Sequence, residues 1–194
     1  MATTIAARRH DACAKLLHDV AAIITPEGVT PSALHAIKLK LVALAKRDAL
    51  FPAADFAMPN AQGRNHPLLV SETDGPSLYL TIGLPGKEAA PHDHGIWCVN
   101  AAISGRERNI HYRRTDGGSG ADGVVLTRIA EVLTQPGHGM AMSDHDIHST
   151  AVLGDEPAIG LALYGYPLSR FPSVAWYHPE FATMRSGASR RTAG

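Results

Sequence analysis

The sequence is short of cysteine, of net charge and of long apolar runs, and each shortage excludes a class of protein. Two cysteines in 194 residues exclude a disulfide framework and suit a reducing cytoplasm. Equal numbers of basic and acidic residues, 18 of each, give no electrostatic footprint for nucleic acid or an anionic membrane. No segment approaches about 18 consecutive apolar residues, and no apolar run follows a basic N-terminus. We therefore expect a cytoplasmic protein, neither exported nor membrane-spanning, with a small-molecule ligand.

The length of the chain predicts one domain, since a chain of this size buries about 70% of its unfolded surface. Helical spacing of apolar residues predicts an amphipathic helix over residues 3 to 24. A second helix is expected to begin at Thr30, the N-cap, and Pro31, and to end at Phe51. Residues 52 to 67, which contain three prolines, are expected to form a loop.

Period-2 alternation of apolar residues and frequent turn signals predict a mainly β protein. The predicted strands are Ser77 to Leu84, Arg106 to Arg114, Val124 to Leu133 and Ala158 to Tyr164. Short strands at regular spacing indicate a jelly-roll barrel. We expect a single domain over residues 1–184, in which helices within 1–51 pack outside a barrel formed by 68–184. Residues 185–194 are expected to be a disordered tail.

Two histidines form the first candidate site. His92 and His94 are two residues apart, so on an extended strand both imidazoles point to the same face. The preceding strand alternates, so that its apolar residues share one face and the residues between them share the other; the apolar ones are Leu78, Leu80, Ile82 and Leu84. The pair therefore lies at the mouth of a half-buried β-structure, where two imidazoles can bind a metal ion.

The segment around this pair has a specific spacing: glycine, five residues, His-x-His, three residues, one ligand position, six residues, glycine. It resembles the first motif of the cupin superfamily, with Gly86, His92, His94 and Gly105 at matching positions. Where most cupins carry a glutamate, this chain has Cys98. The resemblance implies the cupin fold, a double-stranded β-helix.

The second cupin motif usually adds one more histidine, and Gly137 with His148 has the matching spacing. The motif's proline, inner glycine and asparagine positions hold Ser143, His145 and Val152. Three histidines without the glutamate is the pattern of thiol dioxygenases, the cysteine dioxygenase-like cupins. His145 and Asp146 flank the third histidine and are alternative ligands, or Asp146 is an acceptor that orients His148.

This resemblance implies Fe(II) bound by His92, His94 and His148, although imidazole also binds Zn, Ni or Cu and does not select the metal. Three neutral imidazoles leave the charge of a divalent ion uncompensated, which favours an anionic ligand such as a thiolate. The implied partners are a small thiol and O₂, and the implied product is a sulfinate. Metal binding requires unprotonated imidazole, so affinity is expected to fall below about pH 6.5.

The closing strand is the other informative element. Alternation places Gly160, Ala162 and Tyr164 on one face. Thiol dioxygenases typically have Ser-x-His-x-Tyr here, a trio that positions the tyrosine hydroxyl beside iron. The tyrosine is retained as Tyr164, the predicted catalytic residue, but the serine and histidine are absent. This departure indicates a larger, less polar pocket and a bulkier substrate or a different reaction.

Three further residues are candidates by the same resemblance. Cys98 aligns with the cysteine that forms a thioether with the active-site tyrosine in mammalian-type cysteine dioxygenase, or it is a small buried residue. Arg170 and Arg64 are candidate partners for a substrate carboxylate, since a guanidinium pairs with it bidentately. The alternative for Arg170 is a surface position without a role in binding.

The sequence thus predicts an Fe(II) thiol dioxygenase acting on a mercapto acid such as 3-mercaptopropionate, or on a cysteine-like thiol. One alternative is a three-histidine cupin that cleaves a β-diketone-like substrate. Another is a non-catalytic cupin that binds a metal or a small molecule. A homodimer is expected by analogy with other cupins.

Overall fold

The computed structural model describes residues 3–24, 29–59, 63–115, 124–171, 174–178 and 183–187. Two helices come first, α1 (Ile5–Ala21) and α2 (Pro31–Ala45). The Thr30 side chain accepts a hydrogen bond from the Ala33 amide, which confirms the predicted N-cap. Helix α2 stops at Ala45, before the predicted end, because the chain turns into the short helices η1 (Asp48–Leu50) and η2 (Ala53–Asp55).

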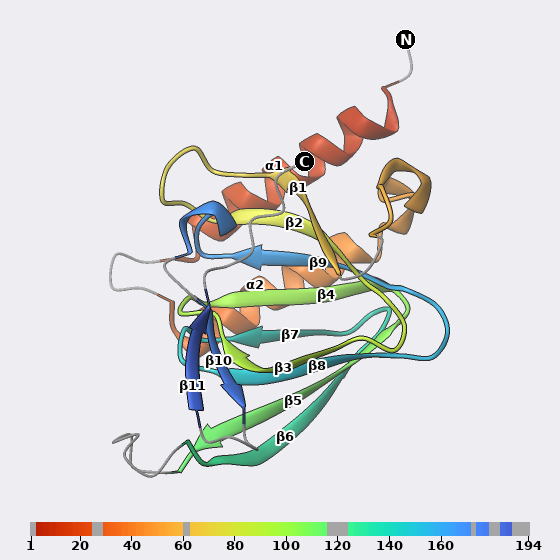
Figure 1. The fold of residues 1–194 in the computed structure, drawn as a ribbon. Helices are drawn as coiled ribbons and strands as arrows, with labels where there is room; N and C mark the ends of the chain where they lie inside the picture. The colour runs from red at the N-terminus through yellow and green to blue at the C-terminus, as the bar shows by residue number, and fades with distance from the viewer. Residues whose placement is uncertain are drawn as a thin grey trace.

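Two antiparallel sheets face each other and form a jelly-roll barrel (Figure 1). The first sheet has the order β1 (Arg64–Leu69), β2 (Ser77–Gly83), β9 (Ala158–Tyr164), β4 (Cys98–Ser104), β7 (Gly139–Met142). The second has the order β11 (Thr183–Gly187), β10 (Val174–His178), β3 (Glu88–Asp93), β8 (Ile147–Leu153), β5 (Arg106–Arg114), β6 (Leu126–Thr134). The predicted fold class, a mainly β jelly roll with two helices outside, is confirmed.

The predicted strand bounds agree closely with the structure. Strands β5 and β9 have the predicted bounds, and β2 ends one residue early at Gly83. The predicted loop over 52–67 is wrong at its end, because β1 begins at Arg64. Strand β1 tolerates Pro67 because it lies at the edge of its sheet, where a missing amide leaves no neighbour unpaired.

The C-terminal strands extend the second sheet. Strand β10 pairs with β3, and β11 pairs with β10. Strand β11 ends at Gly187, so the predicted tail is wrong for residues 185–187, which continue the pairing. Residues 188–194 lie outside the described residues.

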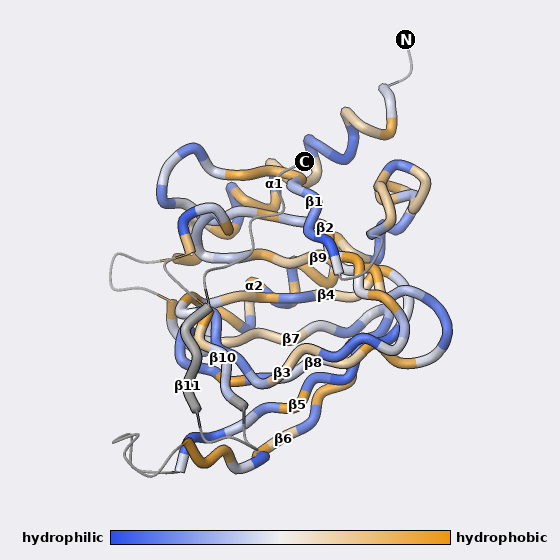
Figure 2. The backbone as a smooth tube through the Cα atoms, viewed as in Figure 1, coloured by the Kyte–Doolittle hydropathy of each residue, from blue (hydrophilic) through white to orange (hydrophobic). Residues whose placement is uncertain are grey.

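The helices cover the outer face of the first sheet (Figure 1), and this side holds the hydrophobic core. Leu78, Leu80 and Ile82 of β2 are buried against the helices, as the alternation predicts. Figure 2 shows apolar stretches along β9 and hydrophilic ones along β5. The apolar face of the first sheet therefore serves the core, and its other face is free to line the barrel interior. Within the described residues, no helix combines the length and the apolar character needed to span a membrane.

Candidate metal centre

The fold brings the three predicted histidines together at one end of the barrel. His92 lies near the end of β3, opposite His148 at the start of β8. His94 follows β3, and its Nε2 atom lies 3.0 Å from Nε2 of His92 and 3.1 Å from Nε2 of His148. Antiparallel pairing of β3 with β8 thus joins residues from two distant motifs into one cluster.

The cluster has the donor set that a divalent transition metal requires. One nitrogen from each ring lies within 4.8 Å of the other two. With metal–nitrogen bonds of about 2.1 Å, adjacent ligands of an octahedron lie about 3.0 Å apart, close to the two Nε2 distances. Three imidazoles arranged in this way can hold one ion and leave other coordination positions for exogenous ligands.

The opposite ring nitrogens fix the orientation of two of these rings. Nδ1 of His92 lies 2.8 Å from the Ala90 carbonyl oxygen, and Nδ1 of His148 lies 3.2 Å from Oδ1 of Asn109. Because both partners are acceptors, both Nδ1 atoms carry the proton and both Nε2 atoms present lone pairs to the metal. Nδ1 of His94 is buried and has no hydrogen-bond partner among the described residues.

Burial lowers the pKa of all three histidines. Desolvation and, to a lesser extent, the neighbouring His92 together lower the pKa of His94 to about 3. The pKa values of His92 and His148 are lowered by the same cause. All three imidazoles are therefore neutral near pH 7, the form that binds metal. Protons therefore compete with the metal ion only at a lower pH than the value of about 6.5 expected from the sequence.

The proposed alternatives at the third ligand do not reach the cluster. The Asp146 carboxylate accepts a hydrogen bond from the Ser143 amide at 2.7 Å and is exposed, so the prediction that it orients His148 is wrong. His145 is also exposed. The turn before β8 points both side chains outward, and Asn109 from the neighbouring strand β5 contacts His148 instead.

Tyr164 faces the barrel interior beside the histidines, at the end of β9. Its ring centroid lies 5.6 Å from that of His94. None of the described residues forms a hydrogen bond with its hydroxyl, and the side chain lines the cavity. Burial raises its pKa, so the hydroxyl keeps its proton and can donate a hydrogen bond.

Cys98 lies directly opposite Tyr164 in the β4–β9 pairing. Side chains of opposed residues have Cβ atoms about 4.5–5.5 Å apart, so the two side chains are neighbours in the interior. Cys98 is fully buried, and burial raises the pKa of its thiol. The thioether to Tyr164 stays a prediction, and its geometric requirement, adjacency in the interior, is met.

A close contact explains one missing member of the Ser-x-His-x-Tyr pattern. A Cβ atom on Gly160 would lie 2.9 Å from the Ala101 carbonyl oxygen of the neighbouring strand β4. Real Cβ atoms do not approach a backbone oxygen this closely, so serine requires the strands to separate. Thr81 of β2, opposite Gly160, places its hydroxyl 3.4 Å from the same point.

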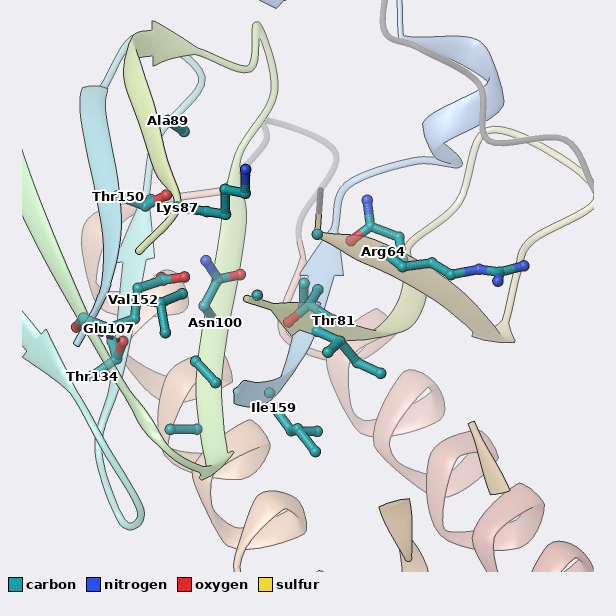
Figure 3. Close-up of a pocket in the computed structure, with 18 of the residues that line it drawn as sticks. Arg64, Thr81, Lys87, Ala89, Asn100, Glu107, Thr134, Thr150, Val152 and Ile159 are labelled. Carbon is teal, nitrogen blue, oxygen red and sulfur yellow. Dashed lines mark hydrogen bonds between the residues drawn. The ribbon is translucent and has the colours of Figure 1, made fainter. Parts of the chain in front are cut away.

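The two candidate arginines have different positions. Arg170 does not line the cavity: its guanidinium pairs with the Asp74 carboxylate and donates to the Glu72 carbonyl on the outside. We therefore withdraw Arg170 as a substrate-binding residue. Arg64 lies at the cavity mouth on β1, with its side chain extending away from Asn100 and Lys87 (Figure 3).

The cavity has a volume of about 1100 Å³ and runs from the histidines to the mouth at Lys87. Four of its polar or aromatic lining residues are absent from the sequence predictions: Lys87, Asn100, Glu107 and Trp176. Glu107 could have been found, because alternation along Arg106 to Arg114 places it on one face with Asn109. Trp176, whose ring centroid lies 4.5 Å from that of His92, gave no local signal, because strand pairing alone brings it there.

Comparisons with known proteins give low similarity only. No protein-family model and no curated protein matches the chain. An uncharacterized conserved protein with a double-stranded beta-helix domain from Klebsiella pneumoniae is 19% identical, covering 66% of this chain and 96% of that chain, with a TM-score of 0.42. A cupin superfamily protein from Desulfitobacterium hafniense is 12% identical (63% and 89% covered, TM-score 0.41). An oxalate oxidase in complex with the substrate analogue glycolate is 17% identical (62% and 57% covered, TM-score 0.45). No function follows from similarities this low.

Proposed function

We propose that this protein is a cytoplasmic, Fe(II)-dependent thiol dioxygenase that oxidises a mercapto acid to its sulfinate. The observation that supports this most directly is the cluster of His92, His94 and His148 facing a cavity. The metal-ligating group found in the described part of the chain contains no carboxylate. A bound dication therefore keeps its full charge, which favours a thiolate from the substrate.

The reaction adds both atoms of O₂ to one sulfur, so that R–SH and O₂ give R–SO₂H. Iron bound by the histidines supplies the activation of O₂. The protein supplies three neutral imidazoles, two of them oriented by hydrogen bonds at Nδ1, and a protonated hydroxyl on Tyr164 that can donate a hydrogen bond into the reaction zone. Phe171 and Trp176 pack against Tyr164 and His92, respectively, and limit the access of water.

The size of the cavity supports a substrate bulkier than 3-mercaptopropionate. Its volume of about 1100 Å³ lies slightly above the range of pockets for drug-sized ligands, about 300–1,000 Å³. Gly160 and Ala162 leave the wall next to Tyr164 without side-chain bulk. Oδ1 of Asn100 is buried without a partner among the described residues, and it can accept a hydrogen bond from the substrate.

The test is metal content of protein purified without added metal, followed by O₂ uptake of the iron-loaded form. Thiols to compare are 3-mercaptopropionate, cysteine, cysteamine and longer mercapto acids, with His94→Ala as the metal-deficient control. Iron near one per chain with thiol-dependent uptake, fastest for a longer acid, is the expected result. O₂ uptake with a β-diketone and not with thiols would show that the substrate is a β-diketone. Bound metal without O₂ uptake on any substrate would make this a binding protein.

A further inference from the structure

A chain of buried hydrogen bonds begins behind the third histidine. Nδ1 of His148 lies 3.2 Å from Oδ1 of Asn109, whose side chain is 0% exposed. Nδ2 of the same Asn109 donates to Oε1 of Glu107 at 3.1 Å. Glu107 in turn lines the cavity wall, next to Thr134 (Figure 3). The chain therefore runs from the cavity wall to a ring of the metal centre.

The partners allow only one direction of donation along this chain. The Thr134 hydroxyl donates to the Glu107 carbonyl oxygen at 3.1 Å, so its oxygen is left to accept from Nδ2 of Asn109 at 3.4 Å. Both acceptors around the amide nitrogen, the Glu107 carboxylate and the Thr134 hydroxyl, hold that nitrogen away from His148. Oδ1 of Asn109 must then face His148, whose Nδ1 must carry the proton.

This arrangement is specific to His148. Nδ1 of His92 is held by a backbone carbonyl, which no substitution removes, and Nδ1 of His94 has no partner among the described residues. Of the three ligands in the described part of the chain, His148 alone depends on a side-chain network. Burial raises the pKa of Glu107, as expected for a carboxyl group enclosed in the wall.

We propose that Asn109 and Glu107 are positioning residues that hold His148 in the tautomer with Nε2 free for metal and join the cavity wall to the metal centre. This rests on the metal centre of the proposed function. It concerns metal binding, so it stands whether or not a thiol is the substrate.

The experiment measures the Kd of Co(II), by chelator competition, and the visible absorption of the Co(II) form. Asn109→Leu removes the acceptor for Nδ1 of His148 and keeps the branched shape of the side chain, and we expect a 10–100-fold weaker Kd with an altered Co(II) spectrum. Thr150→Val is the matched control. Thr150 lies opposite Asn109 in the β5–β8 pairing and lines the same cavity, and its replacement is expected to leave Kd unchanged.

A charge exchange keeps the proposal testable if Asn109→Leu does not fold. Asn109→Asp alone places two carboxylates in contact, whereas Asn109→Asp with Glu107→Gln restores a donor next to the new carboxylate. We expect the double variant to recover wild-type Co(II) affinity and the single variant to lose at least threefold. Equal affinities of these two variants, or an Asn109→Leu Kd within threefold of wild type, overturn the proposal. If the wild-type protein shows no thiol-dependent O₂ uptake while these Co(II) effects are observed, the dioxygenase alone is overturned.

Discussion

At the scale of single residues, the interior face of β9 decides what chemistry Tyr164 can do. Its hydroxyl has no partner among the described residues, and the positions two and four residues earlier carry only Ala162 and Gly160. Any orientation of the hydroxyl must therefore come from the substrate and the metal. Tyr79, on the adjacent strand, instead accepts a hydrogen bond from the Leu168 amide at 3.0 Å.

Tyr164→Phe removes the hydroxyl and keeps the aromatic ring, so it tests the role of the hydroxyl alone. If the hydroxyl acts in the reaction, thiol-dependent O₂ uptake falls about 100-fold while iron content stays near wild type. Tyr79→Phe is the control, because it loses a structural hydrogen bond of about 1 kcal/mol and is expected to keep activity. Steady-state O₂ electrode rates compare the two, and equal losses would contradict the assignment.

Gly160→Ser tests the close approach of β9 to β4. The new side chain must displace the Ala101 carbonyl, 2.9 Å from the Cβ position, so we expect a loss of about 1–3 kcal/mol in the free energy of unfolding. Denaturant titration measures it. Ala162→Ser, on the same face of β9, already has a Cβ and is expected to cost less. A neutral Gly160→Ser would show that the strands separate without cost.

At the scale of elements, strand pairing determines which charged side chains reach the cavity. Lys87 immediately precedes β3 and lines the cavity mouth (Figure 3). Arg170, in the short helix η3 (Leu168–Arg170), lies outside and pairs with Asp74. The positive charge available to a substrate carboxylate thus comes from the mouth.

Lys87→Gln is expected to raise the KM of a carboxylate-bearing thiol about two- to fivefold, the range for an exposed ion pair, with little change for cysteamine. Arg170→Gln is expected to leave both KM values unchanged, because its charge is already paired with Asp74. Initial rates on the iron-loaded variants decide this. A larger rise in KM for Arg170→Gln than for Lys87→Gln would show that Arg170 binds the substrate carboxylate.

Strand β6 lies at the edge of the second sheet. Its residues Ile129 and Leu133 are 52% and 39% exposed, and Val125, directly before the strand, is 53% exposed. A nine-residue edge strand with apolar side chains favours pairing with a second copy. If the expected homodimer forms here, Ile129→Lys converts it to a monomer in light scattering. Met58→Lys, at another exposed apolar residue, 45% exposed, should leave the dimer intact.

At the scale of the whole molecule, the metal centre makes stability depend on pH. The pKa values of His92, His94 and His148 are lowered by burial in the folded state. The unfolded chain therefore binds more protons below its ordinary pKa of about 6.5, and the free energy of unfolding falls as the pH drops. The stability that comes from keeping these imidazoles neutral is fully present above about pH 6.5. It is lost as the pH falls towards their pKa values in the folded state, about 3 for His94.

Metal-free protein is accordingly expected to lose stability steadily from pH 6.5 to pH 4, by up to about 1.4 kcal/mol per pH unit for each histidine. Urea titration at several pH values measures the slope. His94→Gln removes one titrating group and should make the slope shallower. An unchanged slope in this variant would place the acid sensitivity in other groups.

The sequence by itself determined the features that depend on local order. Thr30 and Pro31 fixed the start of α2, alternation fixed the bounds of β5 and β9, and the spacing of His92 and His94 placed both rings on one side. These follow because caps, periodicity and strand alternation act over a few neighbouring residues.

Only the tertiary structure decided which residues from distant strands share an environment. Register between β5 and β8 put Asn109 rather than Asp146 against His148, and pairing of β10 with β3 brought Trp176 to His92. The closeness of β9 to β4 disfavours a serine at position 160. Such contacts depend on pairing register and on distances between strands, and neither is encoded in the spacing within one segment.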